Sequence, residues 1–229
     1  MGSGLFRRRL CVPSVLALAA LCVAPVVAAG RDGEGPGAVA LEDLIQVVLL
    51  DRELMVIDGR GGGRLKKRLE IGEELLYHES QGRVGVAITD RRMLAAGLGS
   101  GSWQEARYRD GERPPTRVYL GDRLALILTA KRWLFFDGGS GNLVDEYFGL
   151  EERLLGVDVD RNVGVIVTNR RALGFSPFVG GRSEVGVQVQ ERVEEIEARS
   201  NLATVRTNRR LLTFRAPTGG WGETQRNLR

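Results

Sequence analysis

Nearly the same nine residues occur twice in this sequence, as VTNRRALGF (Val167–Phe175) and RTNRRLLTF (Arg206–Phe214). Anchored on the Thr of these copies, the pattern extends to five positions that lie 39 or 40 residues apart: Leu50, Thr89, Thr129, Thr168 and Thr207. A repeat of this length makes each structural unit too small to bury its own apolar faces, so neighbouring units must cover one another. No other feature of the chain constrains the fold as strongly.

The columns of the repeat predict β-strands. Five residues and two residues before each anchor, the side chain is apolar in all five copies, within short β-branched runs typical of buried strands. Apolar residues return five and seven residues after the anchor, which is the period-two spacing of a second strand. The Asp/Asn-Arg-Arg between them predicts a tight turn. Twelve residues past the anchor stands a glycine in every copy: Gly62, Gly101, Gly141, Gly180 and Gly219.

Each unit continues with a predicted third strand, such as WQEARYR, and a fourth, such as ELLYHES. Four short strands in one repeat match a single blade of a β-propeller. After Thr207 only 22 residues remain, enough for a second and a third strand but not for a fourth. The segment AVALED (Ala38–Asp43) lies in the register of that missing strand. We therefore expect a ring whose last blade takes its outer strand from the N-terminal part of the chain, which leaves no exposed sheet edge.

In repeat length, strand count and split last blade, residues 37–229 resemble the β-propeller superfamily. The predicted fold is all-β, a five-bladed β-propeller with the last blade closed by an N-terminal strand. The chain lacks the Trp-Asp signature of WD40 repeats and the Gly-Gly pairs of kelch repeats, so no named family is matched. The alternative is a tandem of β-barrel domains of the bacterial pleckstrin-homology type, which carry a TDRR-like turn once per barrel.

Residues 1–29 are typical of a secretory signal peptide, and residues 30–36 of a linker. Three arginines at 7–9 precede an apolar run, and Val27-Ala28-Ala29 supplies the small residues of a cleavage site. The alternative is an uncleaved N-terminal anchor, which also places the remainder outside the cytoplasm. We expect an exported bacterial protein, periplasmic or extracellular, with no membrane span after cleavage.

Composition excludes several classes of activity. Both cysteines, Cys11 and Cys22, lie in the signal, so thiol chemistry is excluded from the mature chain. Removing the signal leaves a net charge of about +1, which gives no reason to expect nucleic acid as a partner. The single histidine, His78, excludes a Ser-His-Asp triad and a histidine-rich metal site. No phosphate-binding or dinucleotide loop occurs. We therefore predict no catalytic residue, no metal and no cofactor.

Cations dominate the turn that follows each anchor. In a propeller these turns surround one mouth of the central channel, where nine cations would bind an anion or an acidic polymer. Alternatively each cation pairs with an acidic residue of an adjacent blade and stabilises the ring, the usual role of a residue that recurs in every blade. The nine are Arg52, Arg91, Lys131, Arg170 and Arg209 at the first position, and Arg92, Arg132, Arg171 and Arg210 at the second, where the first copy has Glu53.

The opposite side carries the glycine-rich loops. Trp103 and Trp221 follow two of these loops and either stack on a sugar or peptide or pack between blades. Asp58 and Asp137 end equivalent strands and either gather at the channel entrance or form turns. Further aspartates precede the anchor strands: Asp43, Asp122 and Asp160.

The predicted function is a non-catalytic binding or scaffolding module of the bacterial envelope. Its loop-rich face would receive a protein, a peptide or a glycan. One alternative is a carboxylate-based hydrolase at the channel mouth, favoured by two aspartates that face a solvent-filled cleft. The other is an anion-binding ring of arginines. Aspartates engaged in their own turns favour the binding module. The oligomeric state stays open.

Overall fold

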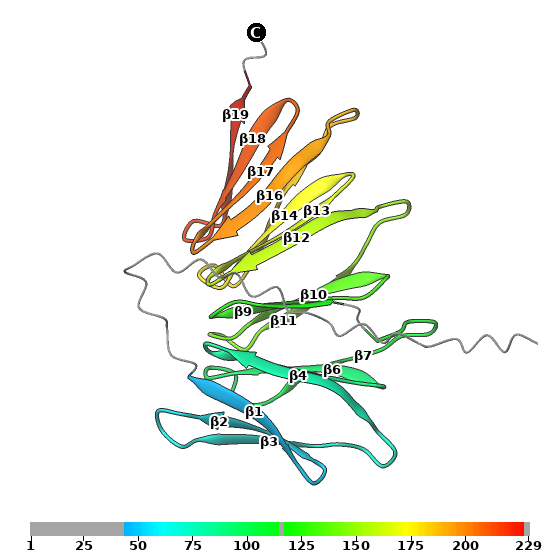
Figure 1. Cartoon of the computed structure of the whole chain (residues 1–229), viewed down its shortest axis with the longest axis vertical. Coiled ribbons are helices and arrows are strands. Elements are labelled where there is room, and N and C mark those ends of the chain that lie inside the picture. Colours follow the sequence, from blue (N-terminus) through cyan, green and yellow to red (C-terminus); the bar gives the residue numbers. More distant parts are fainter. Residues whose placement is uncertain (1–43, 115–116, 227–229) are drawn as a thin grey trace, which may run out of the picture. The chain divides into compact units, whose positions relative to one another are not determined.

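The computed structural model describes residues 44–114 and 117–226. These residues form β-strands in five antiparallel sheets (Figure 1). The first sheet contains β1 (Ile45–Leu50), β2 (Glu53–Asp58) and β3 (Arg64–Arg68). The second contains β4 (Leu75–Gln81), β5 (Val84–Thr89), β6 (Arg92–Gly97) and β7 (Gln104–Arg107). The third contains β8 (Arg117–Leu120), β9 (Leu124–Leu128), β10 (Arg132–Asp137) and β11 (Leu143–Tyr147). The fourth contains β12 (Leu154–Asp160), β13 (Val163–Thr168), β14 (Arg171–Ser176) and β15 (Gly181–Gly186). The fifth contains β16 (Val193–Arg199), β17 (Leu202–Thr207), β18 (Arg210–Arg215) and β19 (Gly220–Gln225).

The chain is therefore all-β and is built from five blades of the β-propeller type, as the repeat predicts. Strands of one sheet pair with their neighbours in chain order, so each blade is an antiparallel meander. In the part of the chain that is described, no helix is long and apolar enough to cross a membrane.

The strand assignment within the blades needs a correction. The strand predicted to end each unit instead begins the next sheet: β4 pairs with β5 and not with β3. Gln81 and Val84 are partners, so only Gly82 and Arg83 separate β4 from β5, and Gly82 has a φ of 53°. A two-residue turn of this kind forms a hairpin. The longer connection from β3 to β4 is the one that crosses between sheets.

This shift changes the prediction for the two ends of the repeat array. The last sheet has four strands of its own, β16 to β19, so it needs no strand from the N-terminal part of the chain. The prediction that Ala38–Asp43 completes the last blade is therefore wrong about which blade is incomplete. The sheet with three described strands is the first. Residues 38–43 themselves lie outside the described residues.

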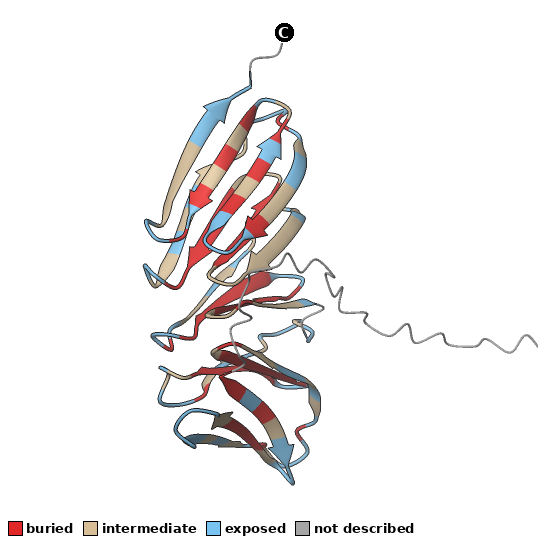
Figure 2. Cartoon of the chain, turned by 60° about the vertical axis from the view of Figure 1, so that its left-hand side comes forward, coloured by how far each residue is buried: buried red, intermediate tan, exposed pale blue. Residues whose placement is uncertain are grey.

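The apolar core consists of four clusters, each between two consecutive sheets. All residues of β5, β6, β9, β10 and β13 are buried, because both faces of the inner sheets are covered. Figure 2 shows this burial on the central strands. Among residues 44–114 and 117–226, no apolar cluster joins the fifth sheet to the first. The ring closure expected from the sequence therefore has no apolar packing between the described strands of these two sheets.

The outer face of the fifth sheet explains why no apolar cluster of the described residues joins it to the first sheet. Val165 and Val167 of the fourth sheet are fully buried against the fifth. One repeat later the same columns hold Thr204 and Arg206, which are half-buried and exposed. A terminal repeat with a polar outer face is what a stack of repeats needs at an end that meets water.

The edge with the glycine-rich loops, here named the glycine-loop edge, holds the sheets together by main-chain contacts. It comprises the loops that follow β2, β6, β10, β14 and β18 and the hairpin turns that precede β5, β9, β13 and β17. Backbone N–H groups of one turn donate to carbonyl oxygens of the next sheet, at 2.7 to 3.2 Å: Leu44 to Gly82, Arg83 to Asp122, Arg123 to Arg161 and Asn162 to Ser200. A Cβ on Gly82 would lie 2.6 Å from the Cα of Asp122, so this approach requires glycine. The opposite edge, with the Asp/Asn-Arg-Arg turns, is named the arginine-turn edge.

Candidate functional site

The second arginine of each turn is held in a buried ion pair. Arg92 lies at the start of β6, and its Nε and Nη2 donate to the two carboxylate oxygens of Glu73, both at 2.8 Å. The Glu73 side chain is fully buried, and that of Arg92 is 4% exposed. Nη1 of Arg92 donates to Glu105 on the adjacent β7 at 2.7 Å. A two-pronged Arg–carboxylate pair is among the strongest polar contacts in proteins.

The repeated threonine completes this arrangement. The Thr89 hydroxyl donates to Glu73 at 2.8 Å and accepts the backbone N–H of Arg92 at 2.9 Å. The same contacts recur in three further sheets, so the Thr-x-Arg-Arg repeat encodes one structural motif. Its other Thr, Arg and Glu members are Thr129, Arg132 and Glu112; Thr168, Arg171 and Glu152; and Thr207, Arg210 and Glu191.

Electrostatics keep these glutamates charged. Burial alone would raise the pKa of Glu73, but Arg92, the Glu70 N–H and the Thr89 hydroxyl outweigh burial and lower it to about 2. The pKa of Glu191 is lowered to about 2 in the same way. Those of Glu112 and Glu152 are also lowered. The second arginines are thus fully engaged by the fold and offer no free charge to an anion.

The first sheet carries the reverse pair. Glu53 replaces the arginine, and Lys66 lies diagonally across from it on β3, opposite Met55, at the position where the other sheets have a carboxylate. Their ion pair measures 2.9 Å, with side chains 40% and 55% exposed. Exchanging both charges keeps the cross-strand attraction, which explains the one exception in the arginine column.

The first cation of each turn lies exposed on the arginine-turn edge. Arg170 lies 3.7 Å from Glu151, and Arg209 donates to the side chain of Gln188 at 3.3 Å. Lys131 donates to the Asp110 carbonyl at 3.2 Å. Arg91 pairs with Glu70 at 3.4 Å, and Arg52 donates to the Glu70 carbonyl. The nine cations therefore form two different sets. Arg92, Arg132 and Arg210 are buried and Arg171 is 20% exposed, each bonded to a buried glutamate, whereas the other five cations are exposed with weak local partners.

Both tryptophans pack between sheets. Trp103 is 7% exposed, belongs to the core between the first and second sheets, and donates to the Leu65 carbonyl at 3.4 Å. Trp221 is half-buried, contacts the Phe214 ring at 5.2 Å between centroids, and donates to the Ser183 carbonyl at 3.1 Å. Of the two roles considered for them, the structure places them in inter-sheet packing.

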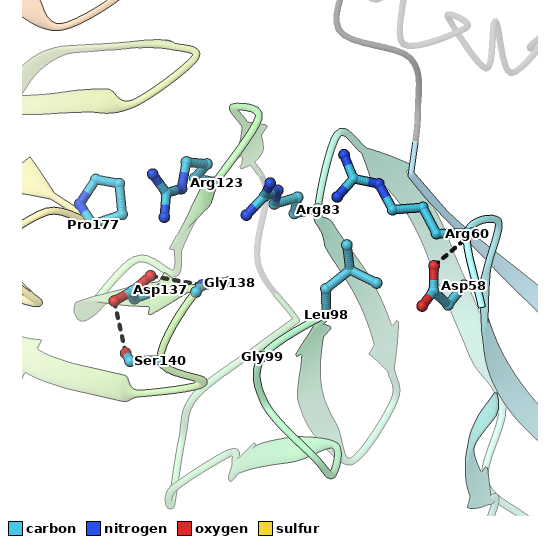
Figure 3. Close-up of a pocket in the computed structure, with 11 residues that line it drawn as sticks. Asp58, Arg60, Arg83, Leu98, Gly99, Arg123, Asp137, Gly138, Ser140 and Pro177 are labelled. Atoms are coloured by element: carbon cyan, nitrogen blue, oxygen red, sulfur yellow. Dashed lines mark hydrogen bonds between the residues drawn. The ribbon is translucent and has the colours of Figure 1, made fainter. Parts of the chain in front are cut away.

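Asp58 and Asp137 line one cavity of about 550 Å³ at the glycine-loop edge (Figure 3). Asp137 is 1% exposed, and its two oxygens accept the Gly139 N–H at 2.8 Å and the Ser140 hydroxyl at 2.6 Å. One oxygen of Asp58 accepts the Arg60 N–H at 2.8 Å. Both carboxylates stabilise their own turns. Asp160 instead accepts the N–H of Ser200 in the fifth sheet at 2.9 Å. Asp122 accepts a backbone N–H through its carbonyl, and Asp43 lies outside the described residues.

Three arginines that the sequence reasoning passed over line the same cavity: Arg60, Arg83 and Arg123. None of them has an ion pair within the described residues. Arg83 and Arg123 stand directly before β5 and β9, whereas the corresponding positions before β13 and β17 hold Asn162 and Asn201. This break in a column of the repeat was the one available signal, since ligand sites tend to depart from repeat symmetry.

No group of three His, Asp or Glu side chains within residues 44–114 and 117–226 is placed to hold a metal ion.

Comparison with known proteins gives only distant likenesses. No protein-family model and no curated protein matches the sequence. Among solved structures, Prp20p from Saccharomyces cerevisiae is similar at a TM-score of 0.41 and 10% identity, over 77% of this chain and 56% of that one. PorZ from Porphyromonas gingivalis, a surface component of the type-IX secretion system, is similar at 0.35 and 12%, over 81% and 27%. The chain spans little more than half of the first structures it resembles. Likenesses this weak carry no argument about ligand or activity.

Proposed function

We propose that this protein is an exported, non-catalytic binding module of the bacterial envelope, and that its ligand binds at the glycine-loop edge. Export rests on the signal-like residues 1–29. The observation that carries the binding role is the cavity of about 550 Å³, which has the size of a ligand pocket and brings together loops from several sheets.

The aspartates in this cavity favour binding over hydrolysis. A glycoside-cleaving pair needs one carboxylic acid and one carboxylate that both face the substrate. Asp137 is 1% exposed, and each of its oxygens accepts a hydrogen bond from its own turn, so its carboxylate is held in the turn and does not face a substrate as an acid or base must. Asp58 uses one oxygen to hold the Arg60 backbone. A protein, a peptide or a glycan that binds without being cleaved suits such a site.

Affinity capture from an envelope extract tests this function. The mature chain, residues 30–229, is used as bait beside two variants. Leu98→Trp fills the cavity from its wall, while Leu150→Trp adds the same bulk at an exposed turn of the arginine-turn edge. We expect one protein or glycan to be recovered by the wild type and by Leu150→Trp but not by Leu98→Trp. Equal recovery by both variants would contradict binding at this edge.

A further inference from the structure

The cavity on the glycine-loop edge collects three cations from three consecutive sheets. Arg60 follows β2, Arg83 lies in the hairpin between β4 and β5, and Arg123 precedes β9. In the view of Figure 3 their guanidinium groups follow one another across the cavity in the order Arg123, Arg83, Arg60. The backbone hydrogen bond from Arg83 to Asp122 fixes the turns of Arg83 and Arg123 beside each other. The fold thus holds like charges together that would otherwise move apart.

These arginines lack the carboxylate acceptors that the buried arginines of the arginine-turn edge have. Arg92, Arg132 and Arg210 each bond a buried glutamate through two nitrogens. By contrast, the Nε of Arg123 is buried and has no hydrogen-bond partner within the described residues. Its guanidinium lies over the Phe178 ring, 5.3 Å from the centroid, which orients the group without accepting its N–H bonds. A buried donor without an acceptor is unfavourable unless a ligand supplies one.

Three of the four carboxylate oxygens that line the cavity accept hydrogen bonds within their own turns. Asp137 accepts from Gly139 and Ser140, and Asp58 accepts from the Arg60 N–H. The Gly138 N–H donates to the Arg123 carbonyl. The free hydrogen-bonding capacity of the cavity therefore consists mainly of guanidinium donors, and their complement is an anion.

We infer that this cavity binds its ligand through a phosphate or sulfate group held by Arg83 and Arg123, with Arg60 at the open side. This inference rests on the proposed function and names the chemistry of its ligand. A phosphate or sulfate ester presents three terminal oxygens in a tetrahedral arrangement to the two guanidinium groups, one more than a planar carboxylate offers. The cavity is larger than a single phosphate group, and Leu98 and Pro177 add apolar wall. The oxyanion is therefore carried on a larger molecule, as a phosphate or sulfate ester.

Calorimetric titration of the mature chain tests the inference, with inorganic pyrophosphate, phosphate and sulfate as probes and acetate as the monovalent control. Variants Arg83→Gln and Arg123→Gln remove the predicted donors, and Arg170→Gln and Arg209→Gln remove matched cations from the arginine-turn edge. We expect each cavity variant to weaken oxyanion binding at least tenfold, because each variant removes charge-assisted hydrogen bonds to the ligand. Tenfold corresponds to about 1.4 kcal/mol. The edge variants should change it less than about twofold. Tighter binding of phosphate than sulfate assigns a phosphate ester, and the reverse order a sulfate ester.

Several outcomes would overturn the inference: acetate binding as tightly as the oxyanions, equal losses in both pairs of variants, or no oxyanion binding at millimolar concentration. Thermal melting of each variant shows that it is folded. The capture experiment separates this inference from the proposed function. A partner still recovered by the Arg83→Gln, Arg123→Gln double variant would leave the binding module standing and refute the oxyanion contact. If oxyanion binding depends on these arginines but no partner is recovered, the oxyanion contact stands and the proposed binding module is refuted.

Discussion

The two edges of the sheets use arginine in opposite ways. On the arginine-turn edge, each of four arginines meets a buried glutamate and a second carboxylate on the neighbouring strand, as Arg210 does with Glu191 and Glu223. On the glycine-loop edge, Arg83 and Arg123 line a cavity and have no ion pair in the part of the chain that is described. The first set recurs in four of the five units, whereas the second set fills its column only before β5 and β9, and Asn162 and Asn201 take that position before β13 and β17. An arginine that recurs in nearly every unit stabilises the unit, while an arginine found in only some units is available to a ligand.

The edges also differ in how they connect the sheets. On the arginine-turn edge, the ion pairs connect successive sheets. Glu73 lies on the connection that enters the second sheet, and its partner Arg92 also donates to the Arg68 carbonyl of the first sheet. On the glycine-loop edge, main-chain hydrogen bonds and close glycine contacts connect successive sheets. Solution conditions and substitutions should therefore affect the two edges separately.

Acid should produce the largest effect, and only through the arginine-turn edge. The pKa of Glu73 and of Glu191 is about 2 in the folded chain, against 4.5 for an unperturbed glutamate. A lowered pKa contributes stability that is fully present above pH 4.5 and is lost as the pH falls toward 2. We expect the melting temperature to drop steeply across that window, and less steeply for Glu191→Gln. A flat profile between pH 4.5 and 2 would contradict the motif.

Removing one buried arginine should have the next largest effect. Arg210→Met leaves Glu191 buried without its counter-ion, which should destabilise the fold by about 3–5 kcal/mol. Arg209→Met removes the adjacent exposed cation and should cost less than about 0.5 kcal/mol. Urea unfolding of the two variants measures the contrast. Similar urea midpoints for the two variants would mean that the buried and the exposed arginines contribute equally to the stability of the fold.

A methyl group on the glycine-loop edge tests the close contacts there. A Cβ on Gly99 would lie 1.8 Å from the Gly139 carbonyl oxygen, so Gly99→Ala should destabilise the fold by about 1–3 kcal/mol. Gly186→Ala is the control, because a Cβ there meets no atom within 4 Å. Equal melting temperatures for these variants would show that the sheets tolerate wider spacing at this edge.

The reversed pair of the first sheet should give the smallest effect. Lys66→Met breaks a contact whose two side chains are largely exposed, and exposed pairs contribute about 0–1 kcal/mol. The loss measured by urea unfolding should fall well below that of Arg210→Met. A loss as large as that one would indicate that the first sheet depends on its ion pair as much as the others do.

The repeat predicts the motif of the arginine-turn edge only in part. Thr and Arg stand out in the sequence because they lie in one turn, at fixed offsets from the anchor. Glu73 stands 16 residues before Thr89, and the other three buried glutamates stand 16 or 17 residues before their threonines. That column was visible in the sequence. Its role was not, because the glutamate lies on the connection that crosses from the preceding sheet.

By itself, the sequence determined that the chain is all-β, that it forms five blades, and that the strands on either side of each anchor are apolar, because these properties follow from periodicities of two and of about 39 residues. The tertiary structure decided which blade each strand joins, which arginines are paired and where the cavity opens. Those outcomes depend on contacts between residues that are often some 20 to 40 positions apart and lie on different sheets. Local patterns do not encode such distances. Arg83 and Arg123 gain their environment only when consecutive sheets stack.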